Sequence, residues 1–462
     1  MTATATSPKL PHIVVLGAGF GGINFCQSFD TTKARITIVD RQNHHLFQPL
    51  LYQVATAGLS APDIAQPIRA VLSGKKNLTV LMDEIESIDL EGKRVQLSQK
   101  TLDYDYLILA LGGATSYFGK NEWEQFAPGL KSLKDALHIR HSVLMAFEQA
   151  ENTSDKAEHD RLMTMVVVGG GPTGVELAGA FSELARTVLA SDFAHIDPKE
   201  ARVILIEAAP RILTHLPTDL SESAVRQLEN LGVEVRVNSK VLDIRHQQLD
   251  LPGETIHAAN IFWTAGVGAA PITKTLGVEL DRGGRVKVEP DCSIPGHPEA
   301  FAIGDIASMM NKKTNAPVPG VSPAAIQMSQ HVAQLIEDEL DPMSVRHGLR
   351  LPFEYWDKGT MATIGRSSAV AMIGKVKFSG FIAWLAWLAV HLLFLVGFRN
   401  RLSVLMNWAY AYFTYKRGSR IITYDPAEPP PFPARHGSAN DAALPAPATV
   451  APAASKEAAP VA

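Results

Sequence analysis

The chain has 462 residues, of which 46% are hydrophobic and 19% are charged, and its formal net charge is −4. At about 150 residues per domain this length predicts two or three domains with large buried cores, and the composition excludes wholesale disorder. Two cysteines, Cys26 and Cys292, exclude a disulfide scaffold and an iron–sulfur cluster held by four thiolates, and the lack of a CxxC pair excludes a dithiol redox centre.

A first phosphate-binding motif follows an apolar, β-branched run at residues 12–16, which predicts a buried strand. The run leads directly into the pattern GxGxxG, whose glycines are Gly17, Gly19 and Gly22. The first glycine permits a tight turn, the second lets the backbone approach a pyrophosphate, and the third lets the next helix pack closely. Asp40 ends a second predicted strand 18 residues beyond Gly22, where a carboxylate would accept a hydrogen bond from a ribose hydroxyl. This order predicts a fold that binds an adenine dinucleotide.

The same arrangement recurs about 152 residues further on, with the glycines Gly169, Gly171 and Gly174. The next acidic strand end is Glu207, 33 residues beyond Gly174, and a helical extension at 186–200 would absorb this unusually long separation. An acid at this position repels a 2′-phosphate, so we expect NADH rather than NADPH as the second dinucleotide.

Two further predicted strands, at residues 107–113 and 261–266, end in small residues and close the two folds. A Gly304-Asp305 pair then follows a strand-like run. In flavoproteins that bind two dinucleotides, such a pair holds the ribityl-phosphate part of FAD. Glu176 lies two residues after Gly174, in the first turn of a predicted helix. It either complements the helix dipole or lies beside the nicotinamide and the flavin, where a carboxylate could orient the ring or relay protons.

The C-terminal part carries a charge asymmetry that the net charge hides. Residues 358–424 contain nine Lys or Arg and no Asp or Glu, which leaves a net charge of −13 on the rest of the chain. A basic block that is also rich in aromatic residues indicates an anionic surface as partner, although a basic subdomain packed on acidic neighbours has the same composition.

Residues 378–398 are apolar enough to be a transmembrane candidate, with His391 as the one ionisable residue. Lysines precede the segment and arginines follow it. A transmembrane helix here would therefore have positive charge on both sides, without the excess on the cytoplasmic side that spanning helices usually show. In the stretch that follows, polar residues recur at helical spacing opposite apolar ones: Arg399, Ser403, Asn407, Thr414 and Arg417 opposite Leu405, Trp408, Tyr412 and Tyr415. We therefore expect two helices that lie along a membrane surface; a true span, a buried core helix and a homodimer interface are the alternatives.

In the order of these motifs the chain resembles the flavoproteins with two dinucleotide-binding domains. Within them it resembles type II NADH dehydrogenase, the single-chain NADH:quinone oxidoreductase. The segments that carry the resemblance are 43–57 (NHHLFQPLLYQVATA), 169–179 (GGGPTGVELAG), 263–267 (WTAGV), 359–366 (GTMATIGR) and 391–402 (HLLFLVGFRNRL).

The resemblance implies an α/β fold of two Rossmann-like, glutathione-reductase-like domains followed by C-terminal membrane-associated helices. It implies one non-covalent FAD per chain, bound by Gly17, Gly19, Gly22, Asp40, Gly304 and Asp305. It implies NADH bound by Gly169, Gly171, Gly174 and Glu207, with Gly266 also binding a cofactor and Glu176 near the nicotinamide. Gln327 matches the last glutamine of the family's quinone-site motif AQxAxQ, whereas Ser322 and Pro323 replace the first Ala-Gln.

These observations predict an FAD-binding domain at 1–118 and 266–345, an NAD-binding domain at 119–265, a membrane-anchoring region at 346–425 and a disordered Pro/Ala tail at 426–462. The expected reaction passes a hydride from NADH to FAD and two electrons to membrane ubiquinone or menaquinone, without proton pumping, at the cytoplasmic face of a bacterial inner membrane. We expect an anionic lipid surface as partner, and neither a nucleic-acid partner nor a metal site. The alternatives are a soluble NADH-dependent reductase, a sulfide:quinone oxidoreductase and a non-catalytic NADH-sensing membrane module.

Overall fold

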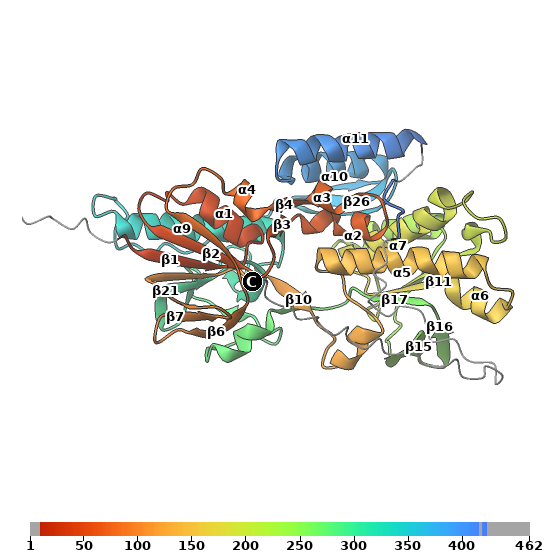
Figure 1. Cartoon of the computed structure of the whole chain (residues 1–462), viewed down its shortest axis with the longest axis horizontal. Coiled ribbons are helices and arrows are strands. Elements are labelled where there is room, and N and C mark those ends of the chain that lie inside the picture. The colour runs from red at the N-terminus through yellow and green to blue at the C-terminus, as the bar shows by residue number, and fades with distance from the viewer. Residues whose placement is uncertain (1–9, 415–417, 423–462) are drawn as a thin grey trace, which may run out of the picture. The chain divides into compact units, whose positions relative to one another are not determined.

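The computed structural model describes residues 10–414 and 418–422, which belong to a unit that ends at residue 422 (Figure 1). The predicted tail at 426–462 lies outside the described residues, as do Tyr415 and Arg417 of the predicted amphipathic stretch. The described residues form a six-stranded sheet that is parallel except for its edge strand, a four-stranded parallel sheet, helices packed on both, and a smaller antiparallel sheet followed by two helices.

The first parallel sheet is centred on β1 (His12–Leu16), which pairs in parallel with β2 (Arg35–Asp40) and β9 (Tyr106–Leu109). All five residues of β1 are buried, which explains why its sequence is a continuous apolar run rather than an alternating one. The sheet has the order β20-β21-β9-β1-β2-β5, with β20 at Ser293–Ile294, β21 at His297–Ala302 and β5 at Leu78–Met82. Because β21 pairs with β9, the chain after residue 302 returns to the edge where the first glycine motif lies.

The second parallel sheet repeats this plan in the order β13-β12-β11-β17. Its strands are β11 (Thr164–Val168), β12 (Arg202–Ile206), β13 (Val233–Arg236) and β17 (Asn260–Trp263), and all of their pairings are parallel. The predicted helical extension at 186–200 is largely wrong: α7 (Pro172–Glu183) continues only as a π-helical turn to Val188, and a single turn follows at Pro198–Glu200.

Helices cover both sheets. Their bounds are α1 (Phe20–Ser28), α5 (Leu133–Glu151), α6 (Lys156–Leu162), α8 (Thr218–Asn230) and α9 (Ser322–Leu340). Antiparallel meanders lie at β6 (Ile85–Asp89), β7 (Arg94–Leu97) and β8 (Thr101–Asp103), and at β14 (Asp243–Arg245), β15 (Gln248–Leu251) and β16 (Glu254–His257). Strands β10 (Gly113–Thr115) and β18 (Val267–Ala269) pair with each other where the chain passes between the two parallel sheets.

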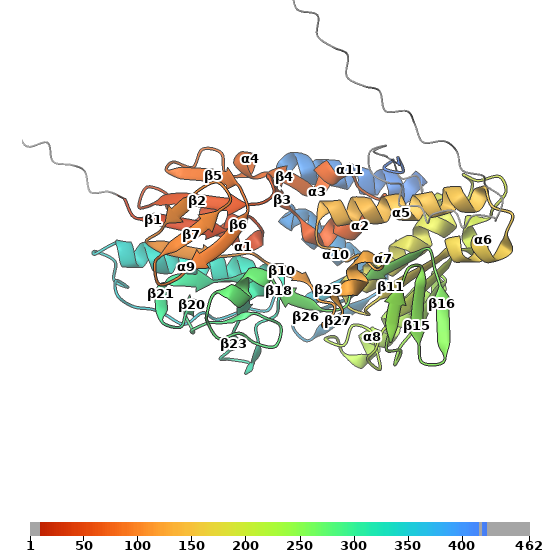
Figure 2. The same cartoon turned by 60° about the horizontal axis from the view of Figure 1, so that its bottom comes forward.

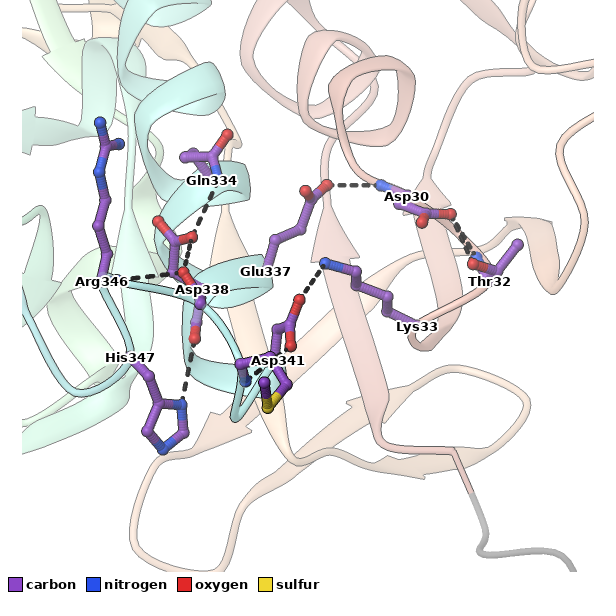
Figure 3. A network of polar contacts seen from close by, with 11 residues as sticks. Asp30, Thr32, Lys33, Gln334, Glu337, Asp338, Asp341, Arg346 and His347 are labelled. Carbon is purple, nitrogen blue, oxygen red and sulfur yellow. Dashed lines mark hydrogen bonds and ion pairs between the residues drawn. The ribbon is translucent and has the colours of Figure 1, made fainter.

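Helix α9 is held to the loop between α1 and β2 by polar contacts at its C-terminal end (Figure 3). Glu337 accepts the backbone N–H of Asp30 at 2.7 Å, and Lys33 lies 3.8 Å from the carboxylate of Asp341. These contacts fix the far end of α9, whose N-terminal end carries Gln327.

The C-terminal part begins with the antiparallel strands β25 (Thr360–Gly365), β26 (Ser368–Ile373) and β27 (Val376–Ser379). Strand β25 packs on α7 so closely that a Cβ on Gly179 would lie 1.7 Å from the carbonyl oxygen of Ile364. Helices α10 (Phe381–Phe394) and α11 (Phe398–Thr414) follow, and Figure 2 shows them from a second side. The two predicted helices are confirmed, with a break at residues 395–397 inside the apolar run.

Helix α11 faces the protein with residues that the sequence pattern predicts on opposite sides of the helix. Ser403 and Asn407 bind Asp63, while Trp408 and Tyr412 line an internal pocket. The residues of α11 that are most exposed include apolar and aromatic side chains: Phe398, Leu402, Leu405, Met406, Tyr410 and Phe413. The predicted opposition of a polar and an apolar face is therefore wrong, because the inner face mixes polar and aromatic residues.

Candidate functional site: two dinucleotide motifs and a carboxylate pocket

The first glycine motif has the geometry that its sequence predicts. Gly17 has φ +97°, and a Cβ there would lie 2.4 Å from the carbonyl oxygen of Ala110. A Cβ on Gly22 would lie 1.8 Å from the carbonyl oxygen of Gly17. At Gly19 a Cβ would meet no atom within 4 Å, so the space in front of the first turn of α1 is open where a pyrophosphate would approach.

Asp40 is fixed by two backbone hydrogen bonds. Its Oδ2 accepts the N–H of Ala18 at 2.7 Å, and its Oδ1 accepts the N–H of Gln42 at 2.7 Å. Each carboxylate oxygen has a second acceptor site, so the side chain is held in place and can still accept a ribose hydroxyl.

The second motif repeats the first position by position. Gly169 has φ +113°, and a Cβ there would lie 2.6 Å from the backbone nitrogen of Ala265. A Cβ on Gly174 would lie 1.9 Å from the carbonyl oxygen of Gly169, whereas a Cβ on Gly171 would meet nothing within 4 Å. This second open turn at the N-terminus of α7 is suited to a second pyrophosphate.

Glu207 occupies the place that Asp40 has in the first fold. Its two oxygens accept the N–H groups of Gly170 at 2.6 Å and Ala209 at 2.7 Å. The nearby Arg211 donates instead to the carbonyl oxygens of Thr214 and Leu216 in its own loop. Glu207 is thus held as Asp40 is, while the guanidinium of Arg211 is occupied by backbone carbonyls, and the role of Glu207 at a second ribose stays a prediction.

Gly266 lies where the two folds are linked. It has φ +75°, and a Cβ there would lie 2.7 Å from the Phe118 ring and from the carbonyl oxygen of Ser116. Trp263 donates its indole N–H to that same carbonyl at 2.9 Å. Packing alone thus requires glycine at position 266, and the role of Gly266 in cofactor binding stays a prediction.

Asp305 lies at the edge of the first fold, near Gly113 and Gly320, and burial raises the pKa of its carboxyl while Lys131 opposes the shift. Among residues 10–414 and 418–422 none donates a hydrogen bond to this carboxylate. The preceding Gly304 has φ +74°, and a Cβ there would press to 3.1 Å from Ala325. An acceptor with no donor among the described residues, beside a glycine with positive φ, fits the hydroxyl-bearing chain of FAD.

Among the carboxyl groups of the second fold, Glu176 has the pKa that differs most from its ordinary value. Burial raises its pKa to about 8, while the backbone N–H of Thr363 and the Trp387 indole N–H oppose the shift. The indole does not reach a hydrogen-bonding geometry, and its Nε1 is buried without a partner among the described residues. The carboxyl of Glu176 and the indole N–H of Trp387 are therefore neighbours that can each still form a hydrogen bond.

Glu176 opens into a pocket of about 280 Å³. Its walls come from α2 (Leu51–Ala55), α7, β25, α10 and α11, segments that are far apart in the sequence. The aromatic wall consists of Tyr52, Trp384, Trp387, Trp408 and Tyr412. Along α7, Glu176 and Glu183 both face the pocket, and the Arg366 guanidinium lies 4.2 Å from the ring centre of Tyr412. The pocket combines flat aromatic walls with a few polar groups, among them the buried Glu176, as a site for an aromatic ring with polar substituents requires.

Gln327, the predicted quinone contact, is engaged with the backbone. Its Oε1 accepts the N–H of Trp356 at 2.9 Å, and its Nε2 donates to the carbonyl oxygen of Trp356 at 3.0 Å. Gln327 thus fixes the segment that carries Trp356, whose side chain is 71% exposed. It does not line the pocket of Glu176, so the structure does not bring the two predicted catalytic residues together there.

Both cysteines are buried and free, and burial raises the pKa of Cys26 to about 12 and that of Cys292 well above its usual value. Neither thiol is therefore a ready nucleophile. Sequence reasoning missed Lys131, a largely buried cation whose pKa burial lowers and Asp305 raises, and the aromatic wall around Glu176. No local motif marks these residues, since tertiary packing alone gathers them.

The fold and the paired motifs define a flavin-dependent pyridine nucleotide oxidoreductase, and the sequence profile described as "Pyridine nucleotide-disulphide oxidoreductase" matches residues 11–330. A second profile, described as "NDH2 C-terminal domain", matches residues 357–416. The chain is 44% identical to "Type II NADH:quinone oxidoreductase Ndh" of Mycobacterium tuberculosis, over 91% of this chain and 92% of the relative. It is 43% identical to "Type II NADH:quinone oxidoreductase NdhA" of the same organism, over 89% of each chain. A solved structure of NDH2 from Plasmodium falciparum, in complex with NADH, shares the fold with a TM-score of 0.81 at 20% identity, covering 89% of this chain and 100% of that one.

The chain belongs to the type II NADH:quinone oxidoreductase family. It is accordingly an FAD-dependent enzyme with NADH as substrate and quinone as acceptor, its flavin is bound non-covalently, and it does not pump protons. This confirms the predicted function over the alternatives of a soluble reductase and a non-catalytic sensor.

Proposed function

We propose that the first glycine motif binds FAD and the second binds NADH. FAD lies on the first fold, held by Gly17, Gly19, Gly22, Asp40, Gly304 and Asp305. NADH lies on the second, held by Gly169, Gly171, Gly174, Glu207 and Gly266. The corresponding division of the chain is 1–118 with 266–345 for FAD, 119–265 for NADH, and 346–425 for the membrane. In support, the six-stranded sheet takes its strands from the first two of these segments and the four-stranded sheet from the third.

Glu176 supplies the proton that the reaction draws from solvent. Bound on the first fold, FAD would supply the chemistry that links hydride transfer from NADH to the two-electron reduction of quinone. The hydride carries one proton, and quinol needs two, so one proton must reach the quinone from the protein. With a pKa of about 8, Glu176 is a neutral acid at pH 7 that can donate this proton in a pocket with flat aromatic walls. This buried acid is the observation that carries the proposal.

The exposed face of α10 and α11 rests on an anionic lipid surface. Large apolar side chains point to solvent along both helices: Phe381, Ile382, Leu385, Leu393, Phe394, Phe398, Leu402, Leu405, Met406 and Phe413. Exposed cations lie close to them in sequence, including Lys375 and Arg399, and residues 358–424 have no acid. No helix among residues 10–414 and 418–422 is long and apolar enough to cross a bilayer. Apolar residues with a basic rim are the pattern of a helix pair that lies in the headgroup region.

We place this surface at the cytoplasmic face of a bacterial inner membrane, since NADH is a cytoplasmic substrate and the quinone is dissolved in the lipid. His391 does not oppose the placement, because burial lowers its pKa to about 4 and leaves it uncharged. Of the flanking cations, Lys377 binds Asp219 and Arg401 donates to the carbonyl of Leu395, so these two also serve the fold.

Charge substitution on the exposed face tests the membrane proposal. Leu405→Glu and Phe413→Glu place acids on side chains that are 47% and 80% exposed, and we expect them to lower binding to vesicles containing phosphatidylglycerol. Leu242→Glu is the matched control, because Leu242 is 53% exposed and lies outside α10 and α11. A homodimer interface predicts a different result: the variants would become monomeric in mass photometry while vesicle binding stayed unchanged.

A further inference from the structure

Asp63 is a buried acid that the reaction does not use. It lies in α3 (Ala61–Ile64), its side chain is 8% exposed, and it forms no ion pair with a Lys or Arg in the described part of the chain. Its Oδ2 accepts the backbone N–H of Ser60 at 2.9 Å and the Ser60 hydroxyl at 2.7 Å. These local bonds leave part of its acceptor capacity for another element.

The remaining capacity is taken up by α11, more than 330 residues further along the chain. The Ser403 hydroxyl donates to Oδ1 of Asp63 at 2.6 Å, and Asn407 Nδ2 donates to Oδ2 at 3.3 Å. Asn400 adds a bond from its Nδ2 to the carbonyl oxygen of Pro62 at 3.1 Å. Residues 400, 403 and 407 recur at helical spacing, so they form one stripe that faces α3.

A second set of hydrogen bonds joins α11 to the wall of the Glu176 pocket. Trp408 donates its indole N–H to Oε1 of Gln53 at 2.8 Å, and Gln53 Nε2 donates to the Tyr52 hydroxyl at 2.8 Å. All three side chains line the pocket into which Glu176 opens. The rotation of α11 about its axis therefore sets both the pocket wall and the face that α11 turns outward.

We propose that Asp63 is a positioning residue for quinone reduction: by holding Ser403 and Asn407, it orients α11 so that Trp408 closes the pocket while the apolar residues of the helix meet lipid. The proposal rests on the proposed membrane surface. A helix turns by about 100° per residue, so an error of one position would bring different side chains to the lipid and withdraw Trp408 from the pocket. A polar contact is well suited to this task because apolar packing alone permits several rotations.

The test exchanges charge between the two sides of the contact. Asn407→Asp keeps the size of the side chain but places a second carboxyl 3.3 Å from Oδ2 of Asp63. Asp63→Asn then removes one of the two facing charges, and its amide oxygen can keep the place of Oδ2 as acceptor for the Ser60 N–H, so the double variant relieves the repulsion. Asp63→Asn alone is a mild change, because the Ser403 hydroxyl both donates and accepts. The charge control is Thr414→Asp, which adds the same charge to the exposed end of α11, 11 residues from Ser403.

The variants are compared as FAD-loaded full-length enzyme on vesicles that contain a long-chain quinone. We expect Asn407→Asp to raise KM for the lipid-dissolved quinone about tenfold, the factor that about 1.4 kcal/mol of lost orientation produces. The rate of flavin reduction by NADH and the FAD content should stay unchanged. Asp63→Asn should bring the KM of Asn407→Asp back to within about threefold of the wild-type value, and should not rescue Thr414→Asp.

Equal rescue of Asn407→Asp and Thr414→Asp would overturn the proposal, because net charge would then explain the effect. A wild-type KM in Asn407→Asp would overturn it as well. Failure of the wild-type enzyme to bind anionic vesicles would instead refute the proposed membrane surface, so the two failures are distinguishable.

Discussion

Replacement of Glu176 by glutamine removes an acid while it keeps the shape and the hydrogen-bonding capacity of the side chain. Glutamine can still accept from the Thr363 N–H that faces this position. It cannot release a proton. The substitution therefore separates the two interpretations of Glu176, the helix-terminal acid and the proton donor.

The size of the effect follows from the pKa. With a pKa of about 8, Glu176 is about nine-tenths protonated at pH 7. An ordinary glutamic acid with a pKa near 4.3 would be about 0.2% protonated, so burial raises the population of the donor several hundredfold. General acid catalysis contributes about 10²- to 10⁴-fold, so we expect Glu176→Gln to slow quinone reduction at least about 100-fold.

Stopped-flow measurement resolves the two half-reactions. Flavin bleaching by NADH should change by less than about threefold, whereas reoxidation by quinone should show the full loss. A raised pKa means that the acid form is present below pH 8 and is lost above it, so the wild-type reoxidation rate should fall as pH rises through about 8. The rate of Glu176→Gln should show no such fall.

Glu183→Gln is the matched control, because Glu183 lines the same pocket from the same helix and also binds the backbone N–H of Arg366. This variant should keep the fall near pH 8. A wild-type quinone rate in Glu176→Gln, with the fall near pH 8 intact, would exclude Glu176 as the proton donor.

Three further predictions concern the cofactor and quinone sites. Gly22→Ala should abolish FAD binding, because its Cβ would lie 1.8 Å from a carbonyl oxygen; purified protein with a full flavin content would contradict this. Glu207→Ala should raise kcat/KM for NADPH about tenfold or more relative to NADH, since the acid that repels a 2′-phosphate is gone; an unchanged ratio would show that Glu207 does not face the ribose. If Gln327 contacts quinone as the family's motif implies, Gln327→Ala and Gln327→Glu should both raise KM for quinone several-fold and leave KM for NADH unchanged; a wild-type KM for quinone in both variants would leave Gln327 only its two hydrogen bonds to the Trp356 backbone.

The nucleotide-binding parts of the site could be predicted because their signals are local. Gly17 and Gly169 need positive φ, Gly22 and Gly174 leave no room for a Cβ, and the sequence pattern expresses these needs within six residues. The acids at 40 and 207 follow from strand ends in the same way. Each of these positions depends on its own βαβ unit, so a linear pattern is sufficient.

The pocket around Glu176 could not be predicted in this way. Tyr52, Trp387 and Trp408 come from three separate elements that meet only in the folded chain. The perturbed pKa of Glu176 is a result of that burial and leaves no trace in the sequence around it.

Helix α11 shows a second limit of sequence reasoning. Its hydrophobic pattern indicates a helix but does not say which face meets the protein. The pattern predicts Ser403 and Asn407 on a face opposite Trp408. In the structure all three point toward the body of the protein, because Asp63 and Gln53 accept their hydrogen bonds there. An amphipathic pattern presumes that the protein is the apolar side, and that presumption fails where a polar neighbour is buried.

We propose that electrons enter from NADH at one fold and leave to quinone through a pocket that also delivers a proton. Single-mixing flavin reduction by NADH, followed by a second mixing with a ubiquinone or menaquinone analogue at pH 6 and pH 9, tests it most directly. We predict rapid bleaching at both pH values, and reoxidation by quinone that is several-fold faster at pH 6 than at pH 9. Reoxidation that is equally fast at both pH values would contradict the role of Glu176, and bleaching without any quinone-dependent reoxidation would contradict quinone as the electron acceptor.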